Sequence, residues 1–373
     1  MGKRDFELDL QPEINLQYSK VNLINRINAM AKLGEILRNP DPEHFRSLAG
    51  EIRKLNETVK TIHLKNSWFT EESVLSAMKN LGHTLKVPTL EKWVKKYDPK
   101  LFEQKKSKSI GVIMAGNIPL VGFHDYLSVL ISGHKLIAKL SSDDNILLPV
   151  IHNLLVKIEP AFKNTVIFAE GTISGFDAVI ATGSNNSSRY FEFYFGKYPH
   201  LIRKNRSSVA VIGGIETGEE LHSLCIDIFS YFGLGCRNVS KLFVPRNYKF
   251  DRFFEAAQDF VEVINHHKYR NNYDYVKAVY LVNKTPHLDN GFLILKEDTG
   301  ISSPVSVLFY EHYQSIHELR EVIKINSERI QCVVSSSNIN YLKKNIQPGK
   351  TQLPALWDYA DNVDTMEFLT GLK

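Results

Sequence analysis

Residues 110–142, IGVIMAGNIPLVGFHDYLSVLISGHKLIAKLSS, contain the pattern from which the fold of this chain can be predicted. A short apolar run leads into an Asn-x-Pro turn, an apolar segment of helical length extends to Gly133, and a second apolar run ends at Lys139. A strand, a helix and a second strand in this order are typical of parallel sheets, whose neighbouring strands are joined by crossover helices. The stretch therefore predicts a parallel α/β sheet.

The rest of the chain extends this pattern on both sides. Short apolar runs alternate with amphipathic segments up to residue 214, and a second such series follows Cys236, whereas residues 15–100 carry Leu, Ile and charged residues at helical spacing. With 373 residues, 43% of them hydrophobic, the chain can form more than one core. We expect a helical N-terminal region, two parallel-sheet α/β domains and a C-terminal tail that returns over both. Their expected bounds are 1–108, 109–214, 215–335 and 336–373.

Composition and charge exclude several classes of protein. The three cysteines have no paired spacing, so we expect no disulfides and a reducing compartment. The first residues lack an apolar secretion segment, and polar residues interrupt the longest apolar stretch, so we expect a cytoplasmic protein with no membrane span. No cluster has the spacing of metal ligands, and no nucleic-acid motif is present.

The net charge of +5 belongs to the N-terminal part of the chain. Residues 1–108 contain 20 Lys and Arg against 14 Asp and Glu, and many of these lysines lie in residues 92–108. Such a run is most often a solvated helix face; the alternative is a docking surface for an anionic ligand or an acidic partner.

Cys236 differs from the other two cysteines. Cys225 lies in an apolar stripe at helical spacing and Cys332 in a short β-branched run, so both are expected in the core. Cys236 instead follows Gly233 and Gly235 in GLGCRN and precedes a predicted strand. A thiol on such a turn is accessible, and Arg237 with nearby backbone N–H groups would favour the thiolate that attacks carbonyl carbons. The alternative is a small residue required by a tight turn.

The same turn is not a dinucleotide-binding fingerprint. GLGCRN begins like GxGxxG, but Asn238 stands at the third glycine and the segment follows a predicted helix instead of a strand. Cys236 is therefore interpreted as a candidate nucleophile, and a nucleotide site has to be sought elsewhere.

Three segments together resemble the aldehyde dehydrogenase superfamily. They are AGNIPLVGFHDYLSVLISGHKLIAKLSS at 115–142, ATGS at 181–184 and GLGCRNVSKLFVP at 233–245, and their order and spacing are similar to those of the superfamily's Asn-x-Pro, Thr-Gly-Ser and catalytic cysteine segments. The helical basic N-terminus and RYFEFYFGKYPHLIRKNRSSVAVIGG look most like the acyl-CoA reductase branch related to the bacterial luminescence fatty-acid reductase. The resemblance implies an aldehyde dehydrogenase-like fold, with a cofactor domain at 109–214 and a catalytic domain at 215–335.

The resemblance implies roles for two catalytic residues. Cys236 would attack an acyl thioester and form an acyl-enzyme. The Asn117 side-chain amide and the backbone N–H of Cys236 would donate to the oxyanion. The alternative for Asn117 is a structural turn before Pro119.

The resemblance also implies a nicotinamide cofactor bound without a glycine fingerprint. Lys139 and Ser141 match positions that contact the adenine-side ribose, although Lys139 could also be an ordinary strand-end lysine. Gly171, Gly183 and Ser184 match turns near the diphosphate.

Two further positions concern the ends of the cofactor. Relatives that prefer NAD often have an acidic residue where Ser142 stands, so we expect NADPH, with NADH as the alternative because Asp143 and Asp144 follow. Glu297 would correspond to the glutamate that holds the nicotinamide ribose, although its spacing to Pro304 is longer than usual.

One departure from the oxidising relatives predicts the reaction. Their glutamate that activates water would fall near Ile202 and Lys204, where no carboxylate is found. An acyl-enzyme that resists hydrolysis but accepts hydride suits a reductase. Three histidines are candidate proton donors to the aldehyde oxygen, although a lone histidine is more often structural. They are His124, His200 and His222.

We therefore expect NADPH-dependent reduction of a long-chain fatty acyl thioester to the aldehyde through an acyl-cysteine. The alternatives are a semialdehyde or acyl-phosphate reductase of the same superfamily, a non-reducing acyltransferase or thioesterase that uses the same thiol, and a catalytically idle subunit. The expected partners are acyl-CoA or an acyl carrier, an acyl-protein synthetase and further copies of the chain.

Overall fold

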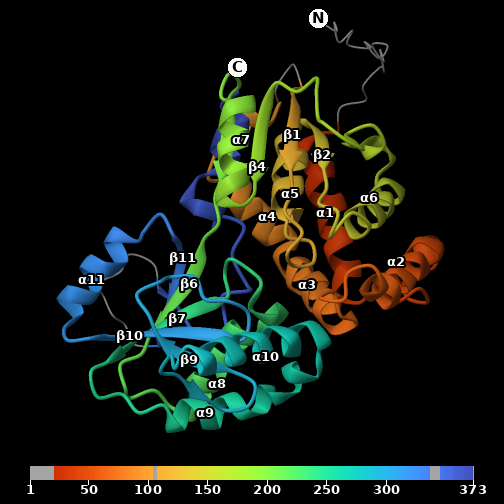
Figure 1. Ribbon diagram of the computed structural model, residues 1–373. Helices are drawn as coiled ribbons and strands as arrows, with labels where there is room; N and C mark the ends of the chain where they lie inside the picture. The colour runs from red at the N-terminus through yellow and green to blue at the C-terminus, as the bar shows by residue number, and fades with distance from the viewer. Residues whose placement is uncertain (1–20, 104–106, 337–344, 373) are drawn as a thin grey trace, which may run out of the picture.

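The computed structural model describes residues 21–103, 107–336 and 345–372. Two sheets lie end to end, and a group of helices from the start of the chain packs beside the first sheet (Figure 1). The fold is α/β with two largely parallel sheets, as expected from the sequence.

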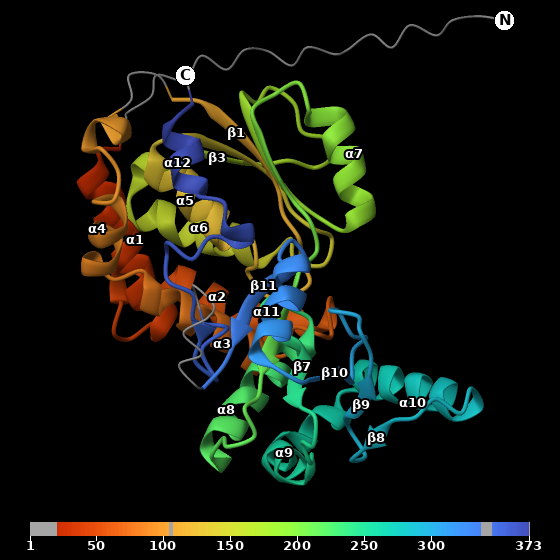
Figure 2. The ribbon, with the colours of Figure 1, turned by 90° about the vertical axis from the view of Figure 1, so that its left-hand side faces the viewer.

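In the described part of the chain, the first sheet has five parallel strands in the order β3-β2-β1-β4-β5. Its strands are β1 (Ser109–Ile113), β2 (Lys135–Lys139), β3 (Val166–Phe168), β4 (Ala178–Thr182) and β5 (His200–Arg203). Its helices are α5 (Phe123–Ser132), α6 (Leu147–Ile158) and α7 (Asn185–Phe195). Helices α5 and α6 lie on one face of the sheet and α7 on the other (Figure 2).

The second sheet has seven strands in the order β12-β11-β6-β7-β10-β9-β8, and the short edge strand β8 pairs antiparallel with β9. Its strands are β6 (Ser207–Val211), β7 (Val239–Pro245), β8 (Leu288–Asp289), β9 (Ile294–Glu297), β10 (Val307–Tyr313), β11 (Ile330–Val334) and β12 (Asn345–Ile346). The remaining helices from residue 215 on are α8 (Gly218–Phe229), α9 (Asp251–Ala257), α10 (His267–Val282), α11 (Ile316–Ile325) and α12 (Thr365–Thr370).

The alternating side chains of β6 and β7 contribute to two separate cores. Leu242 and Val244 pack with α8 and α9, whereas Val209 and Phe243 pack with Leu319 and Ile323 of α11. Because successive residues of a strand point to opposite faces, a sheet covered on both sides needs apolar residues throughout its central strands. This requirement explains the continuous apolar runs in the sequence.

The boundary between the two sheets differs from the expected one. The sequence places it at residue 214, but β6 pairs with β7 and β11 and therefore belongs to the second sheet. The chain leaves the first sheet after Arg203. Residues 345–346 also form a strand of the second sheet and are not yet part of the tail, while residues 337–344 lie outside the described residues. Apolar periodicity identifies a strand but does not show which sheet it joins.

The N-terminal helices share one hydrophobic core with the first sheet and with α5 and α6. They are α1 (Leu23–Arg38), α2 (Ala49–Thr61), α3 (Glu71–Thr84) and α4 (Val87–Val94). The buried Trp93 of α4 donates its indole N–H to the hydroxyl of Tyr359 at 2.6 Å, which ties this region to the end of the chain. The N-terminal helices are therefore packed into the first domain.

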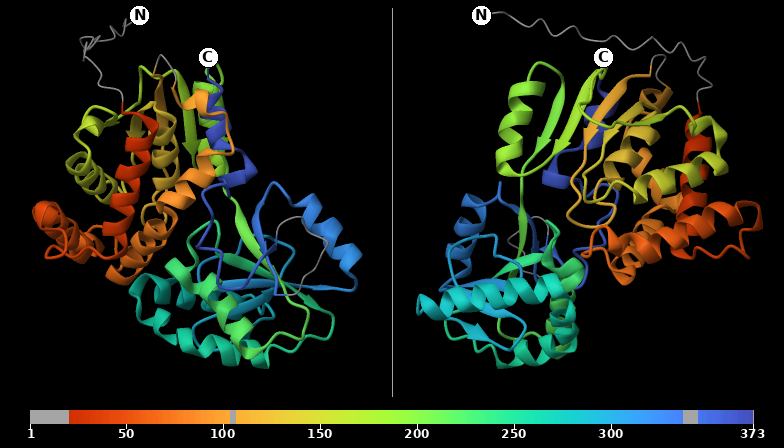
Figure 3. Two further views of the ribbon diagram at one scale, coloured as in Figure 1. Left: turned by 180° about the vertical axis from the view of Figure 1, so that it is seen from behind. Right: turned by 45° about the vertical axis from the view of Figure 1, so that its right-hand side comes forward.

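The C-terminal segment crosses from the second domain back to the first (Figure 3). Its beginning is held by Asp227 of α8, a fully buried carboxylate that accepts hydrogen bonds from Gly349 N, Thr351 N and the Thr351 hydroxyl at 2.7–3.0 Å. Its end, α12, packs on α5, and the carbonyl of Leu369 contacts Nε2 of His134 at 2.9 Å. The segment between these anchors runs past the junction of the two domains.

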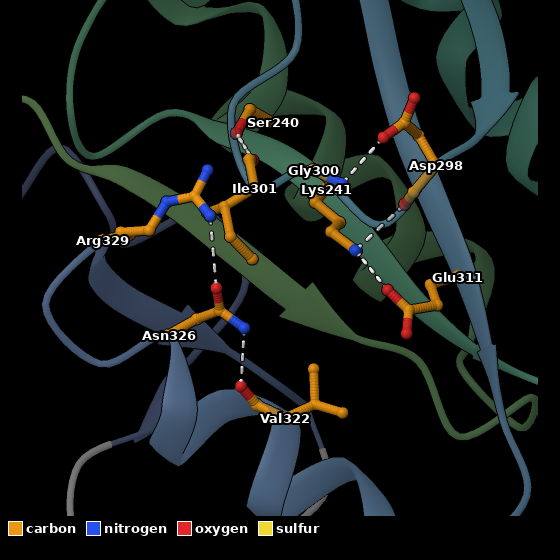
Figure 4. A network of polar contacts seen from close by, with 9 residues as sticks. All are labelled: Ser240, Lys241, Asp298, Gly300, Ile301, Glu311, Val322, Asn326 and Arg329. Carbon is orange, nitrogen blue, oxygen red and sulfur yellow. Dashed lines mark hydrogen bonds and ion pairs between the residues drawn. The ribbon is translucent and has the colours of Figure 1, made fainter.

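The loop after β9 is held against β7 by polar contacts (Figure 4). The ammonium of the fully buried Lys241 donates to the carbonyl of Asp298 at 3.0 Å and pairs with Glu311. The hydroxyl of Ser240 donates to the carbonyl of Ile301 at 2.7 Å. These contacts bring the loop back toward the start of β7.

Candidate active site

Cys236 lies in the turn that joins α8 to β7. The turn begins after α8 with Tyr231, Phe232 and Gly233, which all have positive φ angles. The buried side chain of Asn238 holds it from inside: its amide donates to the carbonyls of Asp227 (2.9 Å) and Ser230 (2.8 Å), and its oxygen accepts from Gly235 N at 2.8 Å. One side chain thereby satisfies orphan carbonyls at the end of α8 and an N–H of the turn.

That Asn238 holds the turn was not predicted from the sequence, in which Asn238 serves only to exclude a glycine fingerprint. An Asn two residues after a candidate nucleophile, at the end of a helix and before a strand, is a recognisable signal because Asn can donate and accept hydrogen bonds together. The hydroxyl of Ser208 on β6 adds a further bond, donated to the carbonyl of Cys236 at 3.0 Å.

The Cys236 thiol is partly buried, and burial raises its pKa above the usual value. Arg237 and Arg203 act in the opposite direction because their positive charges favour the thiolate, while Asp361 raises the pKa further. The expected effect of Arg237 therefore has the right sign, but desolvation outweighs it. The resting thiol is held mainly in its protonated form at neutral pH.

The other two cysteines differ in burial. Cys225 is fully buried in α8, as expected. Cys332 lies in β11, as expected, but it is only partly buried, and its sulfur is 2.8 Å from the hydroxyl of Ser208. Ser208 thus contacts both Cys332 and the backbone of Cys236.

Asn117 lies in the loop after β1 and reaches the Cys236 turn. Its side-chain amide donates to the carbonyl of Leu234 at 2.7 Å, and the neighbouring Ile118 packs against Gly235. Asn117 is 119 residues before Cys236 in the chain, so the tertiary fold brings together the two residues expected to be catalytic. In this geometry the amide is bonded to the turn itself.

Cys236 lies in the wall of a cavity of about 210 Å³. Most of the lining side chains are apolar, and they come from α3, the loop after β1, α5 and the C-terminal segment. The apolar ones are Ala77, Leu81, Ile118, Pro119, Leu120, Val121, Phe123, Leu127, Leu353, Pro354, Leu356 and Ala360. The walls formed by α3 and by residues 352–360 are not evident from the sequence, because they depend on how the N-terminal helices and the tail pack.

Arg203 lines this cavity at the end of β5, between the two positions where the oxidising relatives' glutamate would fall. The buried guanidinium forms an ion pair with Asp125 at 2.7 Å and donates to the hydroxyl of Thr365 at 2.7 Å. The guanidinium of Arg203 thus lies where the oxidising relatives would have a carboxylate.

The cavity nevertheless has carboxylates, which the sequence comparison did not anticipate. Asp125 and Asp358 both line it. Asp125 is paired with Arg203, and Asp358 accepts a hydrogen bond from Ala355 N at 3.1 Å. Asp125 comes from α5 and Asp358 from the C-terminal segment. Both are far in sequence from residues 202–204, so a comparison of that stretch alone could not reveal them.

Of the three histidines considered as proton donors, one lines the cavity. His124 contacts the carbonyl of Leu356 through Nε2 at 2.9 Å, and burial lowers its pKa. His200 lies beside Glu192 of α7, and His222 lies beside Asp259. His124 is therefore a neutral ring at neutral pH with one nitrogen already engaged.

Of the residues expected to bind the cofactor, all but Glu297 lie at the carboxyl edge of the first sheet. Lys139 ends β2, and its ammonium donates to the carbonyl of Gly171, another of the expected residues, at 2.6 Å. Ser184 caps α7 by accepting from Ser187 N at 3.1 Å, and Gly183 precedes it directly after β4. In parallel sheets this edge is where ligands bind.

Ser141 and Ser142 extend the same edge. Ser141 lies so close to Gly116 that a Cβ on the glycine would fall 2.6 Å from that of the serine. Ser142 and Asp143 are both exposed, whereas Asp144 is buried and accepts a hydrogen bond from Leu120 N at 2.8 Å. Asp144 is thus engaged in the fold, and Asp143 is the accessible carboxylate of the pair.

Glu297 is not brought to this site. It ends β9 in register with Tyr310, which pairs in turn with Leu242. Leu242 lies inside β7, whereas Cys236 lies in the turn that precedes this strand. Glu297 is exposed there and does not line the cavity.

Within the described ranges, no three or more His, Cys, Asp or Glu side chains are placed to hold a metal ion. In the same ranges, no helix has the length and apolar character needed to cross a membrane.

Solved structures with a similar arrangement include aldehyde dehydrogenases. An aldehyde dehydrogenase of Mycobacterium tuberculosis complexed with NAD+ is 13% identical, with 86% of this chain and 74% of that chain covered and a TM-score of 0.58. The indole-3-acetaldehyde dehydrogenase AldA of P. syringae, a mutant in complex with NAD+ and IAA, is 13% identical over 85% and 72%, with a TM-score of 0.60. Aldehyde dehydrogenase 21 of Physcomitrella patens, in complex with the reaction product succinate, is 14% identical over 86% and 78%, with a TM-score of 0.55.

These similarities show that the chain has the aldehyde dehydrogenase fold. No protein-family model matches the sequence, and no curated protein matches it significantly. At 12–14% identity the similarity establishes the fold, and the chemistry has to be argued from the site.

Proposed function

We propose that the protein is an oxidoreductase that reduces long-chain fatty acyl thioesters to aldehydes with NADPH, through an acyl group carried on Cys236. The observation that carries the proposal is the position of Cys236 in the wall of a largely apolar cavity, on a turn that Asn117 contacts. An apolar cavity suits an alkyl chain, and a thiol at its wall suits attack on the carbonyl at the end of that chain.

In the first step the Cys236 thiol gives up its proton and its sulfur attacks the carbonyl carbon of the acyl thioester. The bond from this carbon to the carrier sulfur breaks, the carrier leaves as a thiolate that takes up a proton, and the acyl group remains on Cys236. The Asn117 amide and the backbone N–H of Cys236 would stabilise the oxyanion. The amide would have to exchange its bond to Leu234 for one to the substrate oxygen.

The carboxyl edge of the first sheet fits a nicotinamide dinucleotide. It offers the ammonium of Lys139, the exposed Ser142 and the capped start of α7 at Ser184, which suit a phosphate-bearing ligand. The nicotinamide would supply the hydride that reduces the acyl group. Ser142 in place of a carboxylate favours NADPH, while the exposed Asp143 keeps NADH as the alternative.

The possible general bases around Cys236 are engaged in other contacts, which would slow hydrolysis of the acyl-enzyme. A general base needs a carboxylate or imidazole free to accept a proton from water. Among the described residues that line the cavity, Asp125 is paired with Arg203, Asp358 is engaged by Ala355 N, and one nitrogen of His124 contacts Leu356. These contacts would make the three side chains less available as bases, so hydrolysis of the acyl group on Cys236 would be slow compared with its reduction.

The acyl donor would be CoA or a carrier protein, and the basic N-terminal helices offer a surface for such anionic partners. An acyl-protein synthetase and further copies of this chain are proposed partners because the resemblance to the acyl-CoA reductase branch implies them.

The test combines intact-mass measurement with nicotinamide absorbance. The protein is mixed with long-chain acyl-CoA, and we expect the mass of one acyl group on Cys236; on addition of NADPH this mass disappears, NADPH is consumed and aldehyde forms. Cys236→Ala should remove the acyl adduct and all turnover while the circular dichroism spectrum is retained.

Each of the other outcomes would indicate a different function for this protein. Acyl labelling without NADPH consumption would indicate an acyltransferase or thioesterase. Turnover of short acyl phosphates in preference to long acyl-CoA would indicate the related reductase class. No labelling by any acyl donor would disprove the proposal and leave a catalytically idle subunit.

A further inference from the structure

The backbone before Cys236 has an unusual conformation. Tyr231, Phe232 and Gly233 have φ angles of 50°, 58° and 78°, so three consecutive residues lie in the left-handed region. Glycine adopts this region freely, but bulky side chains rarely do. Such a conformation persists only where the surrounding structure holds it. The contacts of Tyr231 and Phe232 therefore show what shapes the Cys236 turn.

Phe232 is held by two aromatic rings from different parts of the chain. Its ring centroid is 5.3 Å from that of Trp68 and 4.5 Å from that of His266. Trp68 and His266 stack on each other at 4.7 Å with an interplanar angle of 17°. Each of the three rings thus contacts the other two, and we call them the Trp68–Phe232–His266 cluster.

The two partners of Phe232 are anchored independently of the turn. Trp68 precedes α3 in the N-terminal region, and His266 caps the start of α10 in the second domain. Nε2 of His266 is 2.9 Å from the carbonyl of Ser67, which joins these two segments directly. Figure 1 shows α3 on the side of the N-terminal helices that faces α10. Phe232 therefore inserts into a junction already closed by other contacts.

Tyr231 adds a second link to the N-terminal region. Ser76 and Asn80 of α3 lie close to its phenol and oppose the rise that burial causes in its pKa. Tyr231 also lines the same cavity as Asn80 and Cys236. Both left-handed aromatic residues thus contact the N-terminal helical region.

We propose that Trp68, Phe232 and His266 are positioning residues that hold the Cys236 turn in its partly buried geometry. Through Trp68, the N-terminal helical region then affects the reactivity of the Cys236 thiol. Trp68 does not line the cavity, so it acts on Cys236 only through Phe232 and the turn. The inference goes beyond the proposed function because it concerns the thiol alone and needs neither NADPH nor an acyl donor.

The test measures alkylation of Cys236 by iodoacetamide against pH, followed by intact mass, in the full chain. When the cluster is broken the turn relaxes, the thiol gains solvent and the burial that disfavours its thiolate is reduced. For Trp68→Ala we expect the alkylation midpoint to move down by at least half a pH unit and the rate near neutral pH to rise at least threefold. Trp68→Phe, which keeps a ring in the cluster, should restore most of the wild-type profile.

A pair of substitutions at Phe232 tests the backbone directly. Both Phe232→Ala and Phe232→Gly remove the ring, but only alanine is disfavoured in the left-handed region. We therefore expect a larger downward shift for Phe232→Ala than for Phe232→Gly. If both variants have the same pH profile of alkylation as the wild type, the inference is overturned.

Tyr280→Ala is the matched control. Tyr280 is a partly buried aromatic residue of α10 that contacts His287 at 5.6 Å and has no part in the cluster. Its loss should leave the alkylation profile unchanged. If Tyr280→Ala and Trp68→Ala shift the profile equally while lowering the urea midpoint equally, the effect is general destabilisation and the inference fails.

Discussion

At the scale of single residues, the chemistry of this protein depends on opposing effects on one thiol. Burial raises the pKa of Cys236, and Arg237, the next residue in the chain, opposes the shift. The guanidinium of Arg237 is held by a hydrogen bond to the carbonyl of Asp358 at 2.9 Å, so its charge has a fixed place beside the turn. Arg237 is therefore the side chain through which the reactivity of Cys236 can be tested.

Replacing Arg237 with Gln should raise the pKa of Cys236 further, because the charge that favours the thiolate is lost. We expect the midpoint of iodoacetamide alkylation to move up by about one pH unit, in the range typical for a neighbouring opposite charge. Arg237→Lys keeps the charge and should retain most of the wild-type profile. Identical midpoints for the Gln and Lys variants would show that Arg237 does not act through its charge.

At the scale of elements, the cavity depends on the C-terminal segment as much as on the sheets. Residues 352–360 form one wall of the cavity, and the preceding residues are fastened to α8 by Asp227. The last residue of α8 is seven residues before Cys236, so one helix supports both the nucleophile turn and the segment that covers it. A change in this anchor should affect both stability and the closure of the cavity.

Asp227→Asn keeps the size of the side chain but leaves only one acceptor oxygen for three donors from Gly349 and Thr351. At least one buried donor then loses its partner, and we expect a loss of roughly 1–3 kcal/mol in the free energy of unfolding. Limited proteolysis should cut the chain beyond residue 345 faster than in the wild type. Asp274→Asn, at an exposed position of α10, is the control. Equal stability of the two variants would contradict the anchoring role.

At the scale of the whole molecule, buried histidines predict sensitivity to acid. Burial lowers the pKa of His124 and His134, and it lowers that of His152 from 6.5 to about 4. Between those two pH values the unfolded chain binds a proton at His152 that the folded protein does not. The contribution of the neutral His152 to the free energy of unfolding is therefore complete above about pH 6.5, and it is lost as the pH falls toward 4.

His152→Gln removes this titration while its side-chain oxygen can still accept from the hydroxyl of Tyr126, which is 3.0 Å from His152 Nδ1. Urea unfolding of both proteins should show the advantage of the wild type shrinking by up to about 3 kcal/mol between pH 7 and pH 4. Other groups, including Asp144 with its pKa of about 6, titrate equally in both proteins and cancel. A constant difference across this pH range would contradict the prediction.

The sequence by itself determined the features that depend on local order. The strand–helix–strand pattern of residues 110–142 predicted the parallel sheet, and the contrast of Cys236 with Cys225 singled out the thiol on a turn. Lys139, Gly171, Gly183 and Ser184 lie at one edge of the sheet because strands of a parallel sheet end on the same side; their contacts with a cofactor stay a prediction.

The tertiary structure decided what depends on segments far apart in the chain. It placed β6 in the second sheet, Arg203 beside Asp125 at the cavity, Trp68 against Phe232, and Glu297 outside the cavity that Cys236 lines. The physical reason is that periodicity and spacing record how a segment folds onto its neighbours in sequence. Which faces and ends meet across the chain is set by the packing of the whole core and by the burial of charges that need a partner there.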